Sequence, residues 1–513
     1  TSIKTMESNS KQCWECRRRC LVCDFTLPAC NRCREDGVDC PGHGASKPES
    51  LEWHTPGMFT SNICKGRGSC EPGRSRSFSR GMKPLLERRI TTPGTLSTST
   101  VKSMSLNLKQ SPTMPDAKEM LDAVIYYNYY IYPEMLPMAE LGTKCWLFPL
   151  CPSYVQRGLQ RPDHVRFSLF AMTLGHRLNR TPNEDQQEAL AKRYYEYRGG
   201  VIESLTESIQ AQQNQPNDFI LAGILTLMLT DAQNGAALNS RCHLEAISRI
   251  ITLRGGIGQV ARAGNLDSLL LCYMSTAVFA NTTAPATDLL MTESHASDLR
   301  ALTRHFDPRT FLFSACPVCL FSEIVSINHL RRQATRPGVL SAERLHDEAV
   351  ALLRSINRFR PLEWSASKPA CRPDWELLGA VYHSAAILYC VSSMQSLSVL
   401  APTIALTTDV DVITVRLQAH LKLAVLSPRL NRFVFWPLMV LGVQAARGSN
   451  ATRIFVAEEM SRMSFRTGTC VPSLARTVLE RFWASGETHW DACFDQPYVF
   501  TTQIAVDTSR VEA

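Results

Sequence analysis

The chain of 513 residues is 44% hydrophobic and carries a net charge of +8. Its longest uninterrupted apolar runs, 219–229 and 433–443, each span 11 residues, fewer than the ~18 needed to cross a bilayer. We therefore expect no membrane-spanning segment, and the chain is long enough to bury a large core. Its first residues, TSIKTMESNS, are polar, so we expect a disordered N-terminus over residues 1–12 and no secretory signal peptide.

Six cysteines follow this N-terminus, and they repeat the spacing C-x2-C-x6-C twice. They are Cys13, Cys16, Cys23, Cys30, Cys33 and Cys40. Two thiolates two residues apart can bind one tetrahedral zinc ion, but each half offers three sulfurs where a structural zinc site needs four. Six sulfurs satisfy two zinc ions if one sulfur from each half bridges both metals. The duplicated spacing therefore predicts two zinc ions.

Disulfide bonds of a secreted domain are the alternative interpretation of these cysteines. The polar N-terminus argues against secretion, and the remaining cysteines are mostly scattered singly through apolar stretches, as buried thiols are in intracellular proteins. Clustered cysteines in a reducing compartment indicate metal binding. The spacing thus favours zinc.

The stretch CWECRRRCLVCDFTLPACNRCREDGVDC resembles the fungal binuclear zinc-cluster transcription factors at all six cysteines, at the arginines after Cys16 and at Pro28. The resemblance implies that Cys13 and Cys30 bridge the two metals. It assigns Cys16 and Cys23 to one metal, and Cys33 and Cys40 to the other. It also implies a short helix after each C-x2-C pair, with the first helix in the major groove of DNA. Arg17, Arg18 and Arg19 fall on that first helix.

Cys20 departs from the family pattern, because the family usually has Lys or Arg at this position, where a side chain reaches base edges. It also forms a second C-x2-C pair with Cys23. The duplicated spacing still selects Cys23 as the ligand, since Cys23 corresponds to Cys40 of the second half. We interpret Cys20 as an additional exposed thiol on the DNA-facing helix. Its presence leaves open whether the chain reads the CGG-type sites that the family commonly reads.

Positive charge is concentrated in the first quarter of the chain. Residues 1–115 contain 18 Lys and Arg against 10 Asp and Glu, whereas the remaining residues contain 37 of each. This asymmetry favours double-stranded DNA as a partner of the zinc module over a solvated basic tail without a partner. Residues 41–115 are rich in Gly, Pro, Ser, Thr and Arg, which predicts a flexible basic linker. The linker has no sustained heptad pattern, so it gives no support for a coiled-coil dimer.

Residues 116–513 are apolar with a helical period, which predicts an all-α domain in one or two lobes. Thr181-Pro-Asn-Glu predicts a helix start, and Gly199 with Gly200 could loosen or interrupt the helix that follows. Gly255-Gly256 predicts the end of another helix. The further predicted helices are 116–136, 217–234, 240–253, 266–280, 342–359, 375–393, 433–446 and 471–484.

The segments RGGVIESLTE, FILAGILTLMLTDAQNG, RCHLEAISRIITLRGGIGQVA and TTAPATDLL resemble the fungal-specific transcription factor regulatory domain. The resemblance implies a helical region that senses a small-molecule inducer or binds a co-regulator. The predicted organisation is thus a disordered N-terminus (1–12), a zinc cluster (13–40), a linker (41–115) and a mainly α regulatory domain (116–513).

Catalytic motifs are absent from the sequence. ITLRGGIGQV lacks the lysine of a phosphate-binding loop, and neither a G-x-S-x-G nor an H-E-x-x-H motif occurs. We therefore expect no catalytic residues. The sequence predicts a nuclear, sequence-specific regulator of RNA polymerase II transcription, which by analogy controls a metabolic or secondary-metabolite gene cluster. The alternative is an α-helical ligand-binding protein or enzyme whose zinc module is vestigial or mediates protein contacts.

Overall fold

The computed structural model describes residues 26, 28–35, 37–38, 40, 114–141, 149–211, 217–235, 237–305, 316–336 and 338–503. The chain divides into two units, Thr1–Arg80 and Gly81–Ala513. Within the described ranges every regular element is a helix, which confirms the predicted mainly α class. The predicted N-terminal segment 1–12 and almost all of the predicted linker lie outside the described residues.

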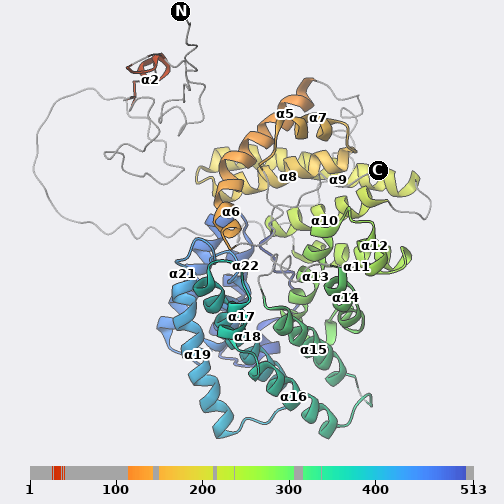
Figure 1. Cartoon of the computed structure of the whole chain (residues 1–513), viewed down its shortest axis with the longest axis vertical. Helices are drawn as coiled ribbons and strands as arrows, with labels where there is room; N and C mark the ends of the chain where they lie inside the picture. The colour runs from red at the N-terminus through yellow and green to blue at the C-terminus, as the bar shows by residue number, and fades with distance from the viewer. Residues whose placement is uncertain are drawn as a thin grey trace, which may run out of the picture. The chain divides into compact units, whose positions relative to one another are not determined.

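The first unit contains one described helix, α2 (Asn31–Glu35). The helices of the second unit are shown in Figure 1. In chain order they are α5 (Met114–Tyr126), η1 (Tyr127–Ile131, a π-helical turn), α6 (Tyr132–Ala139), α7 (Pro152–Leu159), α8 (Asp163–Arg180), α9 (Glu184–Ala211), α10 (Asp218–Gln233), α11 (Ala237–Leu253), α12 (Ile257–Arg262), α13 (Asp267–Thr282), η2 (Ala286–Asp288, a 3-10 turn), α14 (Thr292–His305), α15 (Val318–Ala334), α16 (Ala342–Asn357), α17 (Pro361–Ala366), α18 (Arg372–Ser396), α19 (Ile404–Ala424), α20 (Phe435–Gln444), α21 (Asn450–Thr467), α22 (Val471–Ser485) and α23 (Trp490–Cys493).

Several of these helices begin at a side-chain cap. Asn217 and Ser341 accept hydrogen bonds from backbone N–H groups three residues later, at the starts of α10 and α16. Thr403 and Ser449 do the same for α19 and α21. Such a cap satisfies one of the four N–H groups that lack a partner within a helix, and it fixes where the helix begins. The predicted helix 217–234 is therefore α10, almost to the residue.

Glycines act differently at two predicted positions. At the end of α11, Gly255 has a φ of +85°, and the N–H of Gly256 donates to the carbonyl of Ile251 at 2.9 Å. This is the glycine stop that the sequence predicts. Gly199 and Gly200, in contrast, do not interrupt α9, which runs unbroken for 28 residues. A Cβ on Gly200 would lie 2.8 Å from the ring of Phe167, so this glycine lets α8 approach α9 closely.

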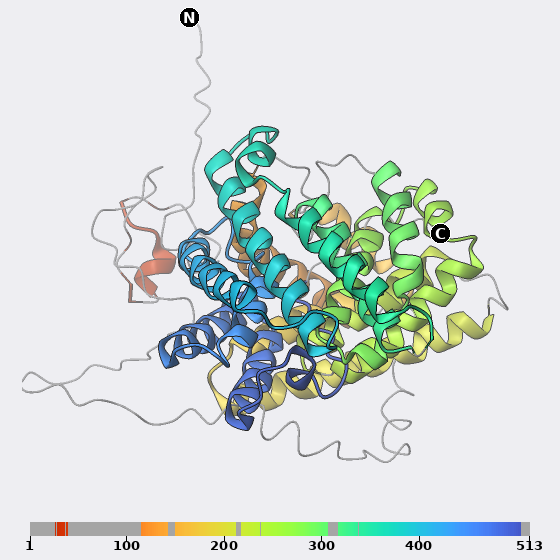
Figure 2. The ribbon, with the colours of Figure 1, turned by 90° about the horizontal axis from the view of Figure 1, so that it is seen from below.

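The helices of the second unit form one continuous packed body. Helix α8 packs against α5, α9 and α10, and α10 continues to α11 and α13. Helix α15 packs against α13, α14, α16 and α18, and α18 in turn packs against α17, α19 and α20. Figure 2 shows the same body from below, with α16–α18 drawn in green-teal to teal and α19 in light blue. One large cluster of buried apolar side chains extends from Met120 to Phe500, and a smaller one surrounds Tyr127 and Met135.

The C-terminal part of the chain contacts its N-terminal helices where α21 packs on α8. The side chain of Asn179 in α8 donates to the carbonyl of Gly468 at 3.2 Å. Just beyond Gly468, the N–H of Cys470 donates to the carbonyl of Gln233 at 2.9 Å. Two segments more than 200 residues apart in sequence are therefore joined through backbone groups.

Helix α18 contains a long apolar stretch. Among the described residues it is the one helix that is long and apolar enough to cross a membrane, and 78% of its most apolar window is buried inside the structure. Leu378, Ala385 and Tyr389 on this helix are fully buried in the protein core. Its apolar character is thus accounted for by burial among the neighbouring helices.

Candidate functional site

The three cysteines of the second C-x2-C-x6-C half lie together in the structure. The sulfurs of Cys30, Cys33 and Cys40 are all within 4.8 Å of one another, and the Cys30 and Cys40 sulfurs are 4.0 Å apart. Four sulfurs around a zinc ion at a Zn–S distance of about 2.3 Å are separated by about 3.8 Å. The Cys30–Cys40 distance matches such an edge, and it is about twice the length of a disulfide bond.

Helix α2 and the turn after it bring these cysteines together. The helix starts directly after Cys30 and contains Cys33. It ends in a Schellman motif, in which Val38 donates to the carbonyl of Cys33 at 2.9 Å and Gly37 donates to that of Arg34 at 3.2 Å. Gly37 occupies the left-handed position of this motif, with a φ of +66°. The reversal of the chain at Gly37 returns Cys40 to Cys30.

The environment of the three sulfurs fits a metal-binding thiolate group. The N–H of Cys33 donates to the Cys30 sulfur at 3.4 Å, and the N–H of Cys30 donates to the Cys40 sulfur at 3.4 Å. Backbone N–H donors stabilise negative charge on sulfur and orient it toward a metal. Cys30 and Cys33 are fully buried. Three convergent thiolates would occupy three of the four positions of a tetrahedral zinc ion and leave one for another ligand.

The other half of the predicted site is outside the described residues. These positions are the predicted ligands Cys13, Cys16 and Cys23 and the predicted DNA contacts Arg17, Arg18, Arg19 and Cys20. The structure therefore brings together three of the six predicted zinc ligands. The roles of the other predicted residues stay predictions.

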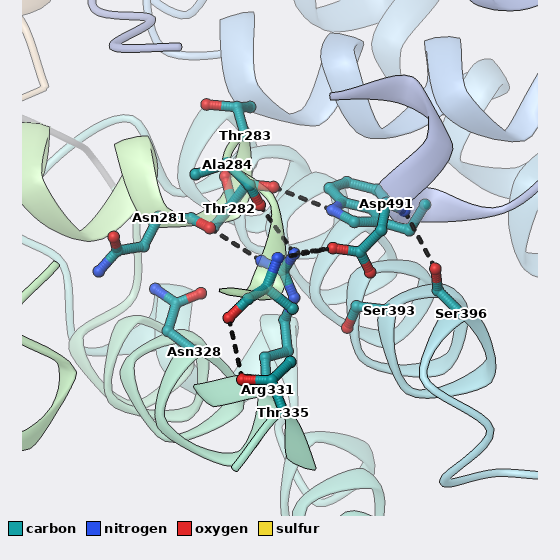
Figure 3. A network of polar contacts seen from close by, with 12 residues as sticks. Asn281, Thr282, Thr283, Ala284, Asn328, Arg331, Thr335, Ser393, Ser396 and Asp491 are labelled. Carbon is teal, nitrogen blue, oxygen red and sulfur yellow. Dashed lines mark hydrogen bonds and ion pairs between the residues drawn. The ribbon is translucent and has the colours of Figure 1, made fainter. Parts of the chain in front are cut away.

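The second unit contains a different polar centre, built around the fully buried Arg331 of α15 (Figure 3). Its guanidinium donates to the carbonyls of Asn281 at 2.8 Å and Ala284 at 2.9 Å, and to a carboxylate oxygen of Asp491 at 2.8 Å. Helix α13 ends at Thr282, where the last carbonyls of a helix lack intrahelical partners. Arg331 therefore caps the end of α13 from a neighbouring helix.

Neighbouring aromatic side chains complete this centre. Trp436 donates to the hydroxyl of Thr282 and Trp490 donates to its carbonyl, each at 2.9 Å. Tyr389 accepts from Arg331 at 3.0 Å and donates to Asn328 at 2.5 Å. Burial raises the pKa of Tyr389 to about 12, so its hydroxyl stays neutral and can donate. The centre joins α13, α15, α18, α20 and α23.

The polar centre lies at the TTAPATDLL stretch, one of the segments whose pattern resembled a regulatory domain. Residues 125–500 match the fungal specific transcription factor domain. A protein of Leptosphaeria maculans, named as a phomenoic acid biosynthesis cluster-specific transcriptional regulator, is 37% identical over 504 residues, which cover 98% of this chain and 91% of that protein. The chain belongs to the fungal specific transcription factor family. No solved structure matches the chain.

Membership of this family makes the chain a transcription regulator rather than an enzyme, as the sequence predicted. The family and the named relative exclude the enzyme part of the alternative interpretation. The family match runs from the last two residues of α5 to beyond α23, so the Arg331 centre is a structural element inside the fungal specific transcription factor domain.

Sequence reasoning did not single out Arg331, although the sequence contains a pattern that could have identified it. Ile324, Asn328 and Arg331 recur at helical spacing with the apolar residues of α15, and all three are fully buried. A charged residue on the apolar face of a predicted helix indicates a buried ion pair. Its partner Asp491 is 160 residues away, which the local pattern does not reveal.

Proposed function

We propose that this transcription regulator is a nuclear, sequence-specific DNA-binding protein that holds two zinc ions in its six N-terminal cysteines. The convergence of Cys30, Cys33 and Cys40 is the observation that supports this proposal most directly. The three sulfurs leave one position of a tetrahedral metal open, and the duplicated spacing supplies further thiolates only in the first half. Bridging by Cys13 and Cys30, as the family resemblance implies, would complete both zinc sites.

DNA recognition is proposed for the segment between Cys16 and Cys23. Arg17, Arg18 and Arg19 would contact phosphates or bases from a helix in the major groove, and Cys20 would occupy the position where the family has a basic residue. The excess of basic residues over residues 1–115 supports this location, because attraction to the phosphate backbone does not depend on the sequence of the DNA. CGG-type sites are the proposed targets.

The regulated pathway and the domain organisation complete the proposal. The Leptosphaeria maculans relative is named for one biosynthetic cluster, which supports control of one secondary-metabolite or metabolic gene cluster by this chain. Residues 1–12, 13–40, 41–115 and 116–513 would act as N-terminus, zinc cluster, linker and regulatory domain. The regulatory domain would receive a small-molecule inducer or a co-regulator.

The decisive experiment measures zinc content and DNA binding of the full chain together. Elemental analysis should give two zinc ions per chain. Fluorescence anisotropy at matched salt should show that a duplex with a CGG site binds more tightly than a scrambled duplex, and a chelator should abolish the difference. One zinc ion per chain, or binding that survives the chelator unchanged, would contradict the proposal.

Variants of the full chain test the proposed contacts. Arg18→Ala should weaken binding and reduce the slope of log affinity against log salt by about one. Cys20→Ser should retain two zinc ions, and Cys20→Arg should tighten binding to CGG sites by roughly 1–3 kcal/mol because arginine can pair with guanine through two hydrogen bonds. Arg354→Ala, an exposed arginine of α16, is the matched control and should change nothing. Loss of a zinc ion in Cys20→Ser would show that Cys20 is a ligand.

A further inference from the structure

A cavity of about 450 Å³ lies between α14, α15 and α16. Helix α15 forms its floor, because α15 packs against both α14 and α16. Each helix contributes side chains at helical spacing, such as Val325 and His329 of α15 or Glu348 and Leu352 of α16. The volume is within the range of about 300–1,000 Å³ that small-molecule sites occupy in proteins.

The floor of this cavity contains two buried polar atoms whose hydrogen bonding is incomplete. Among the described residues, neither Nδ1 of His329 nor Oε1 of Gln333 has a hydrogen-bond partner. The two residues are four positions apart on α15, so they lie on the same face. Both atoms are shielded from solvent, but their side chains line the cavity, so a side-chain rotation turns the atom toward a ligand that supplies the missing hydrogen bond.

The charged side chains that line the cavity in the described structure are both acidic. Glu348 and Glu293 add carboxylates to the amide oxygen of Gln333, and no Lys or Arg is among the residues that line the cavity in the described structure. Glu293 pairs with Arg336 at 2.8 Å, whereas Glu348 is 3.9 Å from Arg344, so Glu348 is the less closely paired acid. This lining favours a ligand that donates hydrogen bonds and disfavours an anion.

The remaining wall is apolar. Val325, Leu330 and Leu352 line the cavity together with Ala296 and Ala351. An apolar wall with a few convergent polar groups is the usual composition of a small-molecule site, in which burial supplies affinity and the polar groups fix orientation. The cavity thus has one polar side for a head group and one apolar side for a carbon skeleton.

We propose that this cavity binds a small molecule with an apolar body and a hydrogen-bond-donating head group, either a primary amine or a hydroxyl. The head group donates to Gln333 and Glu348, and the body packs against Val325 and Leu352. The assignment of this ligand as a regulatory signal rests on the regulatory role proposed above. Binding itself is independent of the zinc cluster and of DNA.

The position of the cavity on α15 connects it to the buried arginine. His329 and Gln333 each lie two residues from Arg331, so they are on the opposite face of the same helix. One face of α15 lines the cavity, and the other carries the guanidinium that caps α13 and pairs with Asp491. A ligand bound in the cavity therefore contacts the same helix that carries Arg331 on its other face.

Three probes with one skeleton test the proposal: phenylbutylamine, phenylbutanol and phenylbutanoate. Isothermal titration and thermal unfolding of the full chain without DNA measure their binding. The amine or the alcohol should bind at least about tenfold more tightly than the carboxylate and should raise the unfolding midpoint. The comparison between amine and alcohol shows which head group the site prefers.

Two substitutions locate the site. Ala351→Phe, at an exposed position of the lining, should fill the cavity and abolish binding, and Gln333→Leu should weaken binding about tenfold by removing an acceptor. Ala484→Phe and Gln210→Leu make the same changes at exposed positions of α22 and α9 and should leave binding unchanged. Circular dichroism verifies the fold of each variant.

Equal or tighter binding of the carboxylate would overturn the proposal. The same holds if neither the amine nor the alcohol binds, or if Ala351→Phe retains full affinity. These outcomes are separate from the DNA-binding experiments, because a chain that fails to bind DNA still has its cavity. Failure of the cavity proposal likewise leaves the zinc and DNA proposal intact.

Discussion

The cysteine-containing segment 30–40 and the helical domain differ in how much apolar surface their described residues bury. The segment has one helix of five residues, and Cys30 and Cys33 are its buried hydrophobic side chains among the described residues. The helical domain buries a large apolar cluster that extends from Met120 to Phe500. A short segment without an apolar core requires metal ligation to offset its conformational entropy, whereas the helical domain has a large core of its own.

Two folding regimes in one chain can be separated by experiment. Removal of metal should affect the first unit alone, and core substitutions should affect the second unit alone. The following predictions test this separation, from the largest expected effect to the smallest.

Loss of zinc should have the largest effect. Cys33→Ser in the full chain should lose bound zinc and specific DNA binding, because structural zinc in short peptides contributes about 10–16 kcal/mol of apparent binding free energy at neutral pH. The unfolding transition of the helical domain should stay within about 0.5 kcal/mol of the parent, as expected for a distant substitution. Elemental analysis and urea denaturation followed by circular dichroism measure the two effects.

The control for this prediction is Cys242→Ser, which replaces an exposed cysteine of α11 and should retain all zinc. A Cys33→Ser chain whose helical domain unfolds at a markedly lower urea concentration would show that metal binding also stabilises the helical domain. That result would contradict the independent stability of the two units.

Substitution of the buried arginine should have the next largest effect. Arg331→Met removes the cap of α13 and leaves Asp491 without its buried partner, so the free energy of unfolding should fall by about 3–5 kcal/mol. Zinc content should not change. Arg332→Met is the matched control, because Arg332 donates to two carbonyls near the surface and should cost only about 1 kcal/mol. Equal losses in the two variants would contradict the central role of Arg331.

Acid should destabilise the helical domain through His295. This side chain is fully buried, and burial lowers its pKa from 6.5 to about 4. Below pH 6.5 the unfolded state binds a proton that the folded state does not, so stability falls as pH drops from 6.5 toward 4. The expected loss is roughly 3 kcal/mol near pH 4.

Urea denaturation of His295→Leu at both ends of this pH range measures that contribution. The variant should show a loss of stability between pH 6.5 and pH 4 that is smaller by roughly 3 kcal/mol. His489→Leu replaces an exposed histidine and serves as the matched control. If His295→Leu and the parent show the same pH dependence of stability, the buried His295 does not contribute to the acid destabilisation.

The two adjacent glycines of α9 provide the smallest test. Gly200→Ala places a methyl group 2.8 Å from the ring of Phe167 and should cost about 1–3 kcal/mol. Gly199→Ala meets no atom within 4 Å and should stabilise the helix by up to about 1 kcal/mol. Thermal unfolding of both variants gives opposite shifts if α8 and α9 pack as described. Two shifts of the same sign would contradict that packing.

Local sequence patterns predicted those features of the fold that depend on local chemistry. Asn217 marks the start of α10 and Gly255 marks the end of α11, because a cap is decided by one residue and its nearest backbone groups. The C-x2-C-x6-C spacing identified Cys30, Cys33 and Cys40 for the same reason, since helix α2 and the Gly37 turn bring them together within eleven residues.

Features that depend on distant partners could not be predicted in this way. Gly200 looked like an interruption of α9 until the structure placed Phe167 of α8 against it. The cavity beside His329 and Gln333 requires the relative positions of three helices, which the period of each helix does not determine. Asp491, the partner of Arg331, is separated from it by 160 residues.

The last short helix, α23, has a consequence for mutations that shorten the protein. Trp490 donates to the carbonyl at the end of α13, and Asp491 pairs with Arg331 and accepts from the N–H of Ala286. A premature stop codon upstream of Trp490 would therefore remove these groups and leave the guanidinium of Arg331 without its carboxylate partner. Alleles that lose only this late segment should behave as destabilised proteins throughout the domain, and a reporter tag would be better appended after this segment than substituted for it.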